Sequence, residues 1–328
     1  MSPKTRYVAI TSLLVLTIGL ATGLVAYYTG FSASAFAGPN GPEEFRLIPA
    51  EASMVAYADV RDLMASPLRQ TVRTLVPMKD DGQREFESQT GIHIETDDDR
   101  VVAAITPTRQ TDTKIPGSGL VFVRGRFDAP KIEALMRSHG AQVEEYKGAR
   151  VIVAPAGQGN PGLSLAFLEP GLVTVGSTAL VRTAVDLKNG SGTNITTNSE
   201  LMALVKDLGE GDAWAVGRFD TLAAQAQLPA GVSQSLPAVT WFSANINVDT
   251  GVRGVVRAVA TTEEAANSLR DVVRGVVALA KLQASSRPEF QAALGSLALG
   301  GTGTSVSLSF NVPAETFDAL RSLAAPAR

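Results

Sequence analysis

The chain contains no cysteine and only two histidines, His93 and His139, among its 328 residues. The absence of cysteine excludes a disulfide scaffold, a thiolate metal site, a thiol nucleophile and a lipid-modified cysteine. A histidine-rich metal site is equally unsupported, because neither histidine has a partner at metal-ligand spacing. We therefore expect neither a metal nor a cofactor.

Charge is also scarce. Only 19% of the residues are charged, and the net charge is −3 at pH 7. A nucleic-acid-binding protein needs a basic face or stripe, so we expect no nucleic-acid partner. Apolar residues make up 45% of the chain, which supports a folded core and argues against a disordered protein.

The common catalytic motifs are missing from the sequence as well. Walker A, G-x-S-x-G and H-E-x-x-H do not occur. Gly157-x-Gly159-x-x-Gly162 matches the dinucleotide fingerprint only as a string, since Pro161 interrupts it and a strand-like stretch follows where a helix is needed. We interpret it as a hairpin loop, and Asp97-Asp98-Asp99 as a solvated turn before a strand. We assign no catalytic residue.

One long uncharged run stands near the N-terminus. Tyr7 to Tyr28 reads YVAITSLLVLTIGLATGLVAYY, 22 residues without a charge. A helix of this length can cross roughly 30 Å of hydrocarbon. Lys4 and Arg6 precede it and the next charge is Glu43, so the positive-inside rule places the N-terminus in the cytoplasm. We predict a single-pass anchor in the bacterial cytoplasmic membrane, with the lipid bilayer as partner through residues 7–28 and the C-terminal domains outside.

A cleaved signal peptide is the alternative interpretation of this segment. Ala35-Phe36-Ala37 is an acceptable A-x-A cleavage site, and cleavage near Ala37 would release a secreted protein. The apolar stretch nevertheless exceeds the core of a signal peptide, which is about 7–15 residues long. The sequence favours the uncleaved anchor and leaves both outcomes open.

The rest of the chain alternates strand-like and helix-like runs. We predict an α+β fold: a transmembrane helix followed by two related α+β domains with mainly antiparallel sheets. The order strand–helix–strand–strand–helix–strand in the first domain is typical of a split βαβ, ferredoxin-like unit. The expected segments are a cytoplasmic tip and anchor over 1–31, a flexible stalk over 32–46, a first domain over 47–190, a linker over 191–199 and a second domain over 200–328.

Several element boundaries can be predicted from capping residues and hydrophobic periodicity. Ser66-Pro67 opens a helix, and Thr197 with Glu200, and Thr261 with Glu264, form capping boxes. The expected strands and helices are strands at 53–60, 101–106, 120–127, 150–154, 163–168, 172–176, 212–219, 240–248, 252–260 and 305–312, and helices from Asp128, over 178–188, through Leu208, after Thr261 and near Phe317.

The tetrapeptide GRFD occurs twice, at Gly125–Asp128 and Gly217–Asp220. Both copies end an apolar strand, and both aspartates stand where a helix N-cap is needed. Phe127 would share a core face with Val121 and Val123. Arg126 and Arg218 would face the other side, which makes them candidate contacts for an anion or a protein partner. A simpler interpretation is a duplicated supersecondary unit, of which Arg61-Asp62 is a weaker third echo.

Two phrases carry a family resemblance. LIPAEASMVAYADVRDLMASPLRQ and LVTVGSTALVRTAVDLKNG resemble an uncharacterised family of bacterial membrane-anchored envelope proteins, over Leu47–Gly190. The resemblance implies an extracytoplasmic α+β protein and carries over no catalytic residue.

The function predicted from these observations is non-enzymatic. We expect an envelope scaffold, a sensor of envelope state or an accessory subunit with a membrane-protein partner, because no convergent set of titratable groups is visible. The alternative is a small-molecule or lipid-binding module that uses an apolar groove. A hydrolase is the third hypothesis.

Overall fold

The structure is a computed structural model and describes residues 41–69, 98–107, 118–154, 163–221, 237–284 and 288–317. These residues divide into two compact units. The first unit contains residues 41–64, 98–107, 118–154 and 163–209, and the second contains residues 65–69, 210–221, 237–284 and 288–317.

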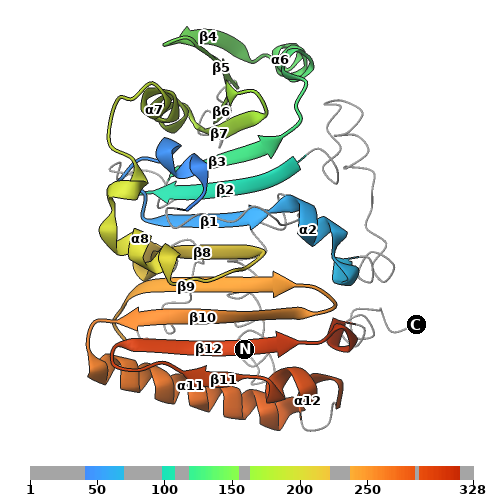
Figure 1. Cartoon of the computed structure of the whole chain (residues 1–328), viewed down its shortest axis with the longest axis vertical. Coiled ribbons are helices and arrows are strands. Elements are labelled where there is room, and N and C mark those ends of the chain that lie inside the picture. The colour runs from blue at the N-terminus through green and yellow to red at the C-terminus, as the bar shows by residue number, and fades with distance from the viewer. Residues whose placement is uncertain are drawn as a thin grey trace, which may run out of the picture. The chain divides into compact units, whose positions relative to one another are not determined.

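The first unit is built on an antiparallel sheet with the strand order β1-β2-β3-β7-β6-β5-β4 (Figure 1). Its elements in chain order are η1 (Glu43–Leu47), β1 (Met54–Asp59), α2 (Val60–Ala65, whose last residue falls in the second unit), β2 (Asp98–Thr106), β3 (Ser118–Gly125), α6 (Ala129–Ser138), β4 (Gln142–Tyr146), β5 (Ala149–Val153), β6 (Leu163–Glu169), β7 (Leu172–Ser177), α7 (Thr178–Lys188), η2 (Ile195–Thr197) and α8 (Ser199–Lys206).

The second unit is also built on an antiparallel sheet, with the order β8-β9-β10-β12-β11. Its elements are β8 (Ala213–Arg218), β9 (Val239–Val248), β10 (Val252–Ala260), α11 (Glu263–Gln283), α12 (Pro288–Gly295), β11 (Ala298–Gly300) and β12 (Ser305–Val312). Residues 67–69 are helical and belong to this unit, where the amide of Leu68 donates to the carbonyl of Asp249 at 2.9 Å.

The two sheets share one strand order. In each unit the first three strands are consecutive neighbours, the last strand pairs with the third, and the penultimate strand pairs with the last. A helix follows the third strand in both units, α6 after β3 and α11 after β10. The first unit differs by the added hairpin β4–β5. The shared order supports the prediction of two related α+β domains with antiparallel sheets.

The predicted split βαβ pairing is wrong for the strands that the structure describes. A split βαβ unit needs two parallel strands on either side of a third. In the first unit β1 instead pairs directly with β2, and β2 with β3, so that no strand lies between β1 and β2. Sequence order alone misled here, because it does not specify which strands are neighbours in the sheet.

The GRFD copies occupy different places in this shared order. Gly125 ends the third strand of the first unit, whereas Gly217 lies near the end of the first strand of the second unit. The topological counterpart of the second copy is the weaker echo, since Arg61 follows β1 at the start of α2 as Asp220 follows β8. The shared order therefore relates 56–62 to 215–221, and the exact tetrapeptide match is not the equivalent pair.

The two faces of β3 are buried to different degrees. Leu120 and Phe122 on one face are fully buried, while Val121 and Val123 on the other are only partly buried. The predicted core face of β3 is thus the wrong one, and Phe127 is likewise only partly buried after the strand has ended. Period-2 alternation gives two faces but does not say which one is covered. The covered face carries η1 and α7 in Figure 1.

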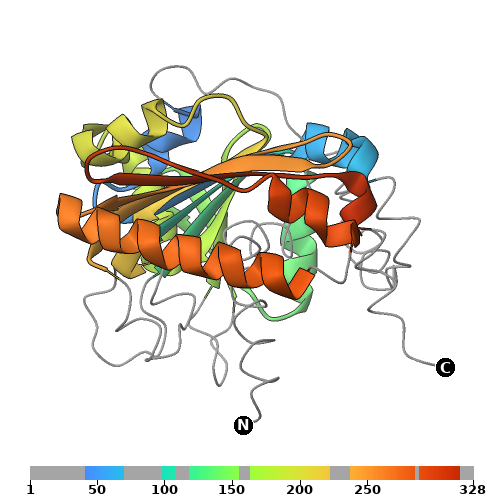
Figure 2. The same ribbon diagram turned by 90° about the horizontal axis from the view of Figure 1, so that it is seen from below.

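The core of the second unit lies between its sheet and α11, which runs along one face of the sheet in Figure 2. Ala266 and Leu269 of the helix pack with Ala260 and Val306 of the strands. The strand predicted at 305–312 is confirmed as β12, in which Val306 and Phe310 are buried. The strands predicted at 240–248 and 252–260 pair as the β9–β10 hairpin, with Val248 opposite Val252.

Helix caps agree with the sequence in two places and differ by one residue in two others. Asp128 caps α6 by accepting from the amide of Lys131 at 3.0 Å, and Ser66 accepts from the amide of Arg69 at 3.2 Å. The cap of α8 is Asn198 rather than Thr197, and that of α11 is Thr262 rather than Thr261. Neighbouring polar residues all suit a cap, so backbone geometry makes the final choice.

Two segments expected to be loose are partly packed. Residues 41–46 of the predicted stalk include Glu44 and Phe45, each 1% exposed. Within the predicted 191–199 linker, Ile195 of η2 is fully buried and its amide donates to the carbonyl of Ile48 at 2.9 Å. Composition alone did not predict that these two segments pack, because a single buried apolar residue can fix an otherwise polar segment to the fold.

None of the helices that the structure describes is both long and apolar enough to cross a membrane. The predicted anchor, residues 7–28, lies outside the described residues. So do residues 32–40 of the predicted stalk, His93 and the Gly157–Gly162 motif, which joins the antiparallel neighbours β5 and β6.

Candidate functional site

The most densely charged buried region of the first unit lies where η1 meets the sheet. Glu44, in the middle of η1, is 1% exposed. The short helix forms because the amide of Phe45 donates to the carbonyl of Pro42 at 3.0 Å, and that of Ile48 to the carbonyl of Phe45 at 3.2 Å. Gly41 permits the entry, with a φ of +77° and a hydrogen where a Cβ would come 2.6 Å from the Phe45 ring.

Two arginines from adjacent strands meet the Glu44 carboxylate. Arg100 of β2 and Arg124 of β3 are direct partners in the antiparallel register. Arg124 Nε donates to Glu44 Oε1 at 2.7 Å, and Arg100 Nε to the same oxygen at 3.2 Å. The side chains of Arg100 and Arg124 are only 16% and 22% exposed. Like charges opposite one another on a sheet repel, and Glu44 supplies the compensating charge.

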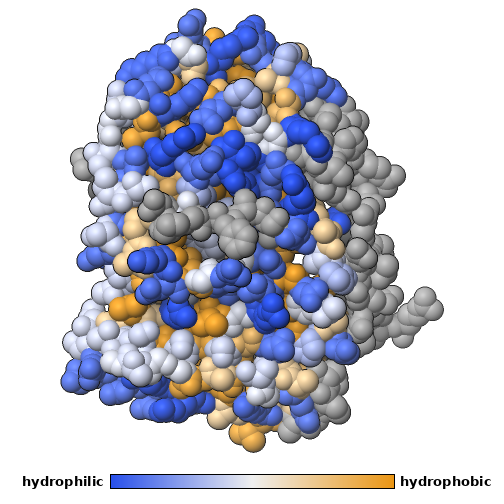
Figure 3. All heavy atoms as spheres, in the orientation of Figure 1, coloured by the Kyte–Doolittle hydropathy of each residue, from blue (hydrophilic) through white to orange (hydrophobic). Residues whose placement is uncertain are grey.

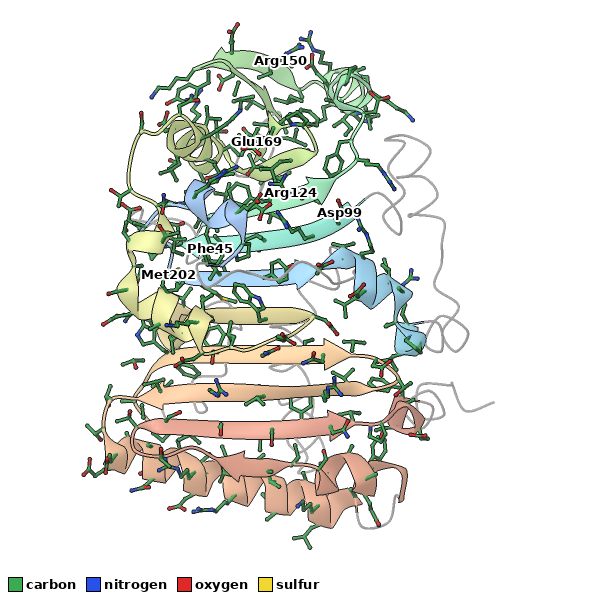
Figure 4. The ribbon with its side chains drawn as sticks, viewed as in Figure 1. Phe45, Asp99, Arg124, Arg150, Glu169 and Met202 are labelled. Carbon is green, nitrogen blue, oxygen red and sulfur yellow. The ribbon has the colours of Figure 1, made fainter. Side chains whose placement is uncertain are left out.

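A more exposed ring of charges surrounds this centre. Glu43 Oε2 lies 3.5 Å from Arg100 Nη2 and 3.6 Å from Arg124 Nη2. Arg46 Nη2 donates to Glu169 Oε1 at 2.8 Å, and the other oxygen of Glu169 lies 3.9 Å from Arg124 Nη2. Figure 4 shows Phe45, Arg124 and Glu169 where η1 meets the sheet, and Figure 3 shows hydrophilic side chains gathered over this part of the unit.

Tyr57 and Asp59 of β1 extend the cluster along the sheet. Asp59, 3% exposed, is the register partner of Arg100. The Tyr57 hydroxyl donates to Asp59 Oδ2 at 3.3 Å. Burial, followed by the negative charge of Asp59, raises the pKa of the Tyr57 hydroxyl well above its ordinary value, so this side chain stays neutral.

Charge balance and residue types indicate what the cluster can do. Three arginines face four carboxylates, those of Glu43, Glu44, Asp59 and Glu169. Arginine does not exchange protons near neutral pH, and a neutral tyrosine beside a carboxylate is no nucleophile. Buried Glu44 Oε2 and Arg124 Nη2 have no hydrogen-bond partner among the residues that the structure describes, so the pairing within the cluster is imperfect. The arrangement fits the fixation of η1 to the sheet better than it fits catalysis.

The apolar neighbours of Glu44 reinforce this fixation. Phe45, Leu47 and Ile48 are each no more than 1% exposed. Burial of side chains of this size stabilises a fold by about 1.5–3 kcal/mol each relative to exposure. The charged centre therefore lies beside well-packed apolar side chains, and together they hold η1 against the sheet.

The two arginines predicted as site residues do not belong to this cluster. Arg126 follows β3 and is exposed, in the first unit. Arg218 belongs to the second unit, where its Nη2 donates to Asp220 Oδ2 at 3.0 Å and its guanidinium lies 5.9 Å from the Trp241 ring. That hydrogen bond is the main reason why the pKa of Asp220 is lowered. Each arginine thus lies in a separate unit at the end of a strand.

The remaining residues singled out from the sequence have local structural places. His139 ends α6, and its Nδ1 lies 2.9 Å from the carbonyl of Leu135. Asp99 forms an ion pair with Arg61. Trp214 is 7% exposed in β8, in keeping with a core residue. Among the described residues, no group of three or more histidine, aspartate or glutamate side chains could hold a metal ion.

Glu44, Arg100 and Arg124 were missed in the sequence because they are far apart in it: 56 residues separate Glu44 from Arg100, and 80 separate it from Arg124. One signal was available. Arg100 stands directly before the apolar run of β2, and Arg124 stands directly after the apolar run of β3. A charge beside a buried strand is unfavourable unless it is paired.

Comparison with known proteins does not show a family. No protein-family model matches the chain, and no curated protein matches it in sequence. The chain is similar to the solved structure of crystal form I of TP0453, at 12% identity and a TM-score of 0.44, over 88% of this chain and 99% of that one. A likeness at this level carries no argument about function.

Proposed function

We propose that the chain is a membrane-anchored bacterial envelope protein whose two α+β units work outside the cytoplasmic membrane. The observation that carries this proposal is the uncharged run of 22 residues, Tyr7–Tyr28, behind Lys4 and Arg6. Its length matches a bilayer and its flanking charges match an N-in orientation. The anchor acts as a transmembrane helix, and a secreted form cut near Ala37 is the competing outcome.

The role that we propose is non-enzymatic: a scaffold, a sensor of envelope state or an accessory subunit of a membrane complex. The described charge cluster supports it, because its arginines and carboxylates neutralise one another and hold η1. A catalytic site needs instead a base, acid or nucleophile aimed at an open position.

A membrane-protein partner is favoured by one surface feature. α11 exposes Val272, Leu279 and Leu282, at 41%, 53% and 70%. Their spacing places them along one stripe of the helix. Exposed apolar side chains gathered in this way are typical of surfaces that bind a partner.

Fractionation of the full chain tests the location. We expect it in the membrane fraction after carbonate extraction, and a C-terminal reporter active outside the cytoplasm. A C-terminus in the cytosol would overturn the proposal. N-terminal sequencing separates the two tethering hypotheses, since a mature chain beginning at Phe36 or Gly38 means cleavage.

Affinity purification from gently solubilised membranes tests the role. We expect a membrane protein to be recovered with the wild-type chain and lost with Leu279→Lys/Leu282→Lys. The matched control is Ser268→Lys, an exposed position nearer the start of the same helix. Recovery of the chain alone in a quantitative extraction would contradict the accessory-subunit role.

A further inference from the structure

Residues 41–50, which we name the strap, form the first described segment after the predicted anchor and include the last residues of the predicted stalk. They are not a strand of the sheet of the first unit, and Pro49 forms an isolated antiparallel bridge with Asn194. The strap is held to β2 and β3 through Glu44, and to the core through Phe45, Leu47 and Ile48.

The strap is also tied to a segment far along the chain. The amide of Ile195 donates to the carbonyl of Ile48 at 2.9 Å, and the amide of Ala50 donates to the carbonyl of Thr193 at 3.0 Å. Asn198 then caps α8, the last helix before the second unit begins at Glu210. The strap thus joins three parts of the chain: the end of the stalk, the sheet and the 191–209 segment that leads to the second unit.

One buried carboxylate contributes to the hold of the strap beside its apolar side chains. The backbone bonds described between the strap and residues 191–209 are those of Ala50 with Thr193 and of Ile195 with Ile48. Removing Glu44 leaves Arg100 and Arg124 opposite one another without their buried counter-charge. A buried charge without a partner is strongly unfavourable. Loss of the Glu44 charge is therefore expected to weaken the hold of the strap on β2 and β3.

We propose that the strap is the clamp through which the membrane anchor is mechanically fixed to the folded chain, with Glu44 as its key residue. Load on the stalk enters at Gly41, passes through the Glu44–Arg100–Arg124 centre into the sheet, and reaches the 191–209 segment through Ile48 and Ile195. This inference rests on the proposed anchor and adds to it a route by which attachment is coupled to the segment before the second unit.

Hydrogen exchange of the full chain in detergent tests the clamp. In Glu44→Gln, which keeps size and removes charge, we expect the amides of Ile48, Ala50 and Ile195 to exchange at least about tenfold faster, because they open together by local unfolding. Amides of the β9–β10 hairpin should keep their wild-type rates. The matched control is Glu43→Gln, whose side chain is 67% exposed beside the same arginines and which should change little.

Wild-type exchange of the strap in Glu44→Gln would overturn the clamp. Faster exchange at Ile48 with no change at Ile195 would overturn the coupling. If Glu44→Gln unfolds the whole chain, Glu44→Asp keeps the charge on a shorter side chain, and it must then loosen the strap selectively for the inference to stand.

A pulling experiment tests the load itself. Because the chain has no cysteine, Ser34→Cys and Ala327→Cys provide two specific handles. With the handles in place, Glu44→Gln should lower the force of the first unfolding event and Glu43→Gln should not; equal forces would contradict the load path. Both experiments measure the folded chain, so the two failures can be told apart: a failed fractionation test would remove the anchor and with it the clamp, whereas membrane location with an unchanged strap in Glu44→Gln would remove the clamp alone.

Discussion

Arg100 and Arg124 stand directly opposite one another on adjacent antiparallel strands, and one oxygen of Glu44 accepts a hydrogen bond from both. Without the carboxylate, the register of β2 and β3 would bring two positive charges together in a half-buried place. The sheet and the strap therefore stabilise each other. Two facing guanidinium groups without a carboxylate are unfavourable, and so is a buried carboxylate without its guanidinium partners.

Glu44→Ala is expected to lower the free energy of unfolding by about 3–5 kcal/mol, since it strands two partly buried guanidinium groups. Glu43→Ala, at an exposed position beside the same arginines, should cost less than about 1 kcal/mol. Urea denaturation of both variants measures the difference. A double-mutant cycle with Arg124→Ala should give a coupling energy of about 1–3 kcal/mol, and additivity would show that the pair is not a unit.

Phe45→Ala is expected to destabilise the chain by about 3–5 kcal/mol, because it empties a fully buried site under the strap. The control is Leu282→Ala, which removes a large apolar side chain that is 70% exposed and should stay within about 0.5 kcal/mol. Thermal unfolding followed by circular dichroism compares them. Equal shifts in Tm would mean that the strap is not docked as described.

Local signals predicted much of this fold. The bounds of α7 and β12 were predicted to within a residue, since a cap, an apolar stripe and clean alternation all lie within the segment itself. The strands predicted at 240–248 and 252–260 are close enough in the chain to pair as the β9–β10 hairpin. The failures are non-local. Which face of β3 is more covered depends on η1 and α7, and the strand order depends on pairings between distant segments, such as β3 with β7.

The candidate site was invisible for the same reason. Glu44 lies in a stretch rich in Gly and Pro that reads as a stalk, and nothing near it in sequence shows that its carboxylate will be buried. The repeated GRFD motif attracted attention because it is contiguous, yet its copies occupy different strands of the shared order. Pairings across 56 and 80 residues are set by sheet register, which single-sequence patterns do not specify.

Asp128→Ala is expected to cost about 1 kcal/mol, because the amide of Lys131 loses its acceptor at the start of α6. Asp128→Asn should cost at most a few tenths, since an asparagine oxygen caps equally well. Chemical denaturation at moderate salt separates capping from a general charge effect. If Asn is as harmful as Ala, the carboxylate acts through charge rather than as a cap.

Arg218→Ala is expected to return the pKa of the Asp220 carboxyl toward its ordinary value, because the Arg218 hydrogen bond is the main cause of the lowered pKa. A depressed pKa in the folded state gives stability that is present above the unfolded pKa of about 3.9 and is lost as pH falls through the folded pKa. A carboxyl NMR titration checks the shift. An unchanged Asp220 titration would show that this ion pair is not formed in solution.

Tyr57→Phe is expected to change the alkaline limb of the stability profile. Burial and Asp59 raise the pKa of the Tyr57 hydroxyl, so the folded state holds this proton more tightly than the unfolded state. The resulting stability is complete below the unfolded pKa of about 10 and is lost as pH rises toward the folded pKa. The wild-type chain should therefore weaken above about pH 10 more than Tyr57→Phe does.

Near pH 7 the wild-type chain should be the more stable of the two, because Tyr57→Phe loses the hydrogen bond to Asp59, worth about 1 kcal/mol. Urea denaturation from pH 7 to pH 11 gives both limbs of the profile. Parallel profiles for the wild type and Tyr57→Phe would show that the hydroxyl is solvated and that β1 is not covered beside the strap.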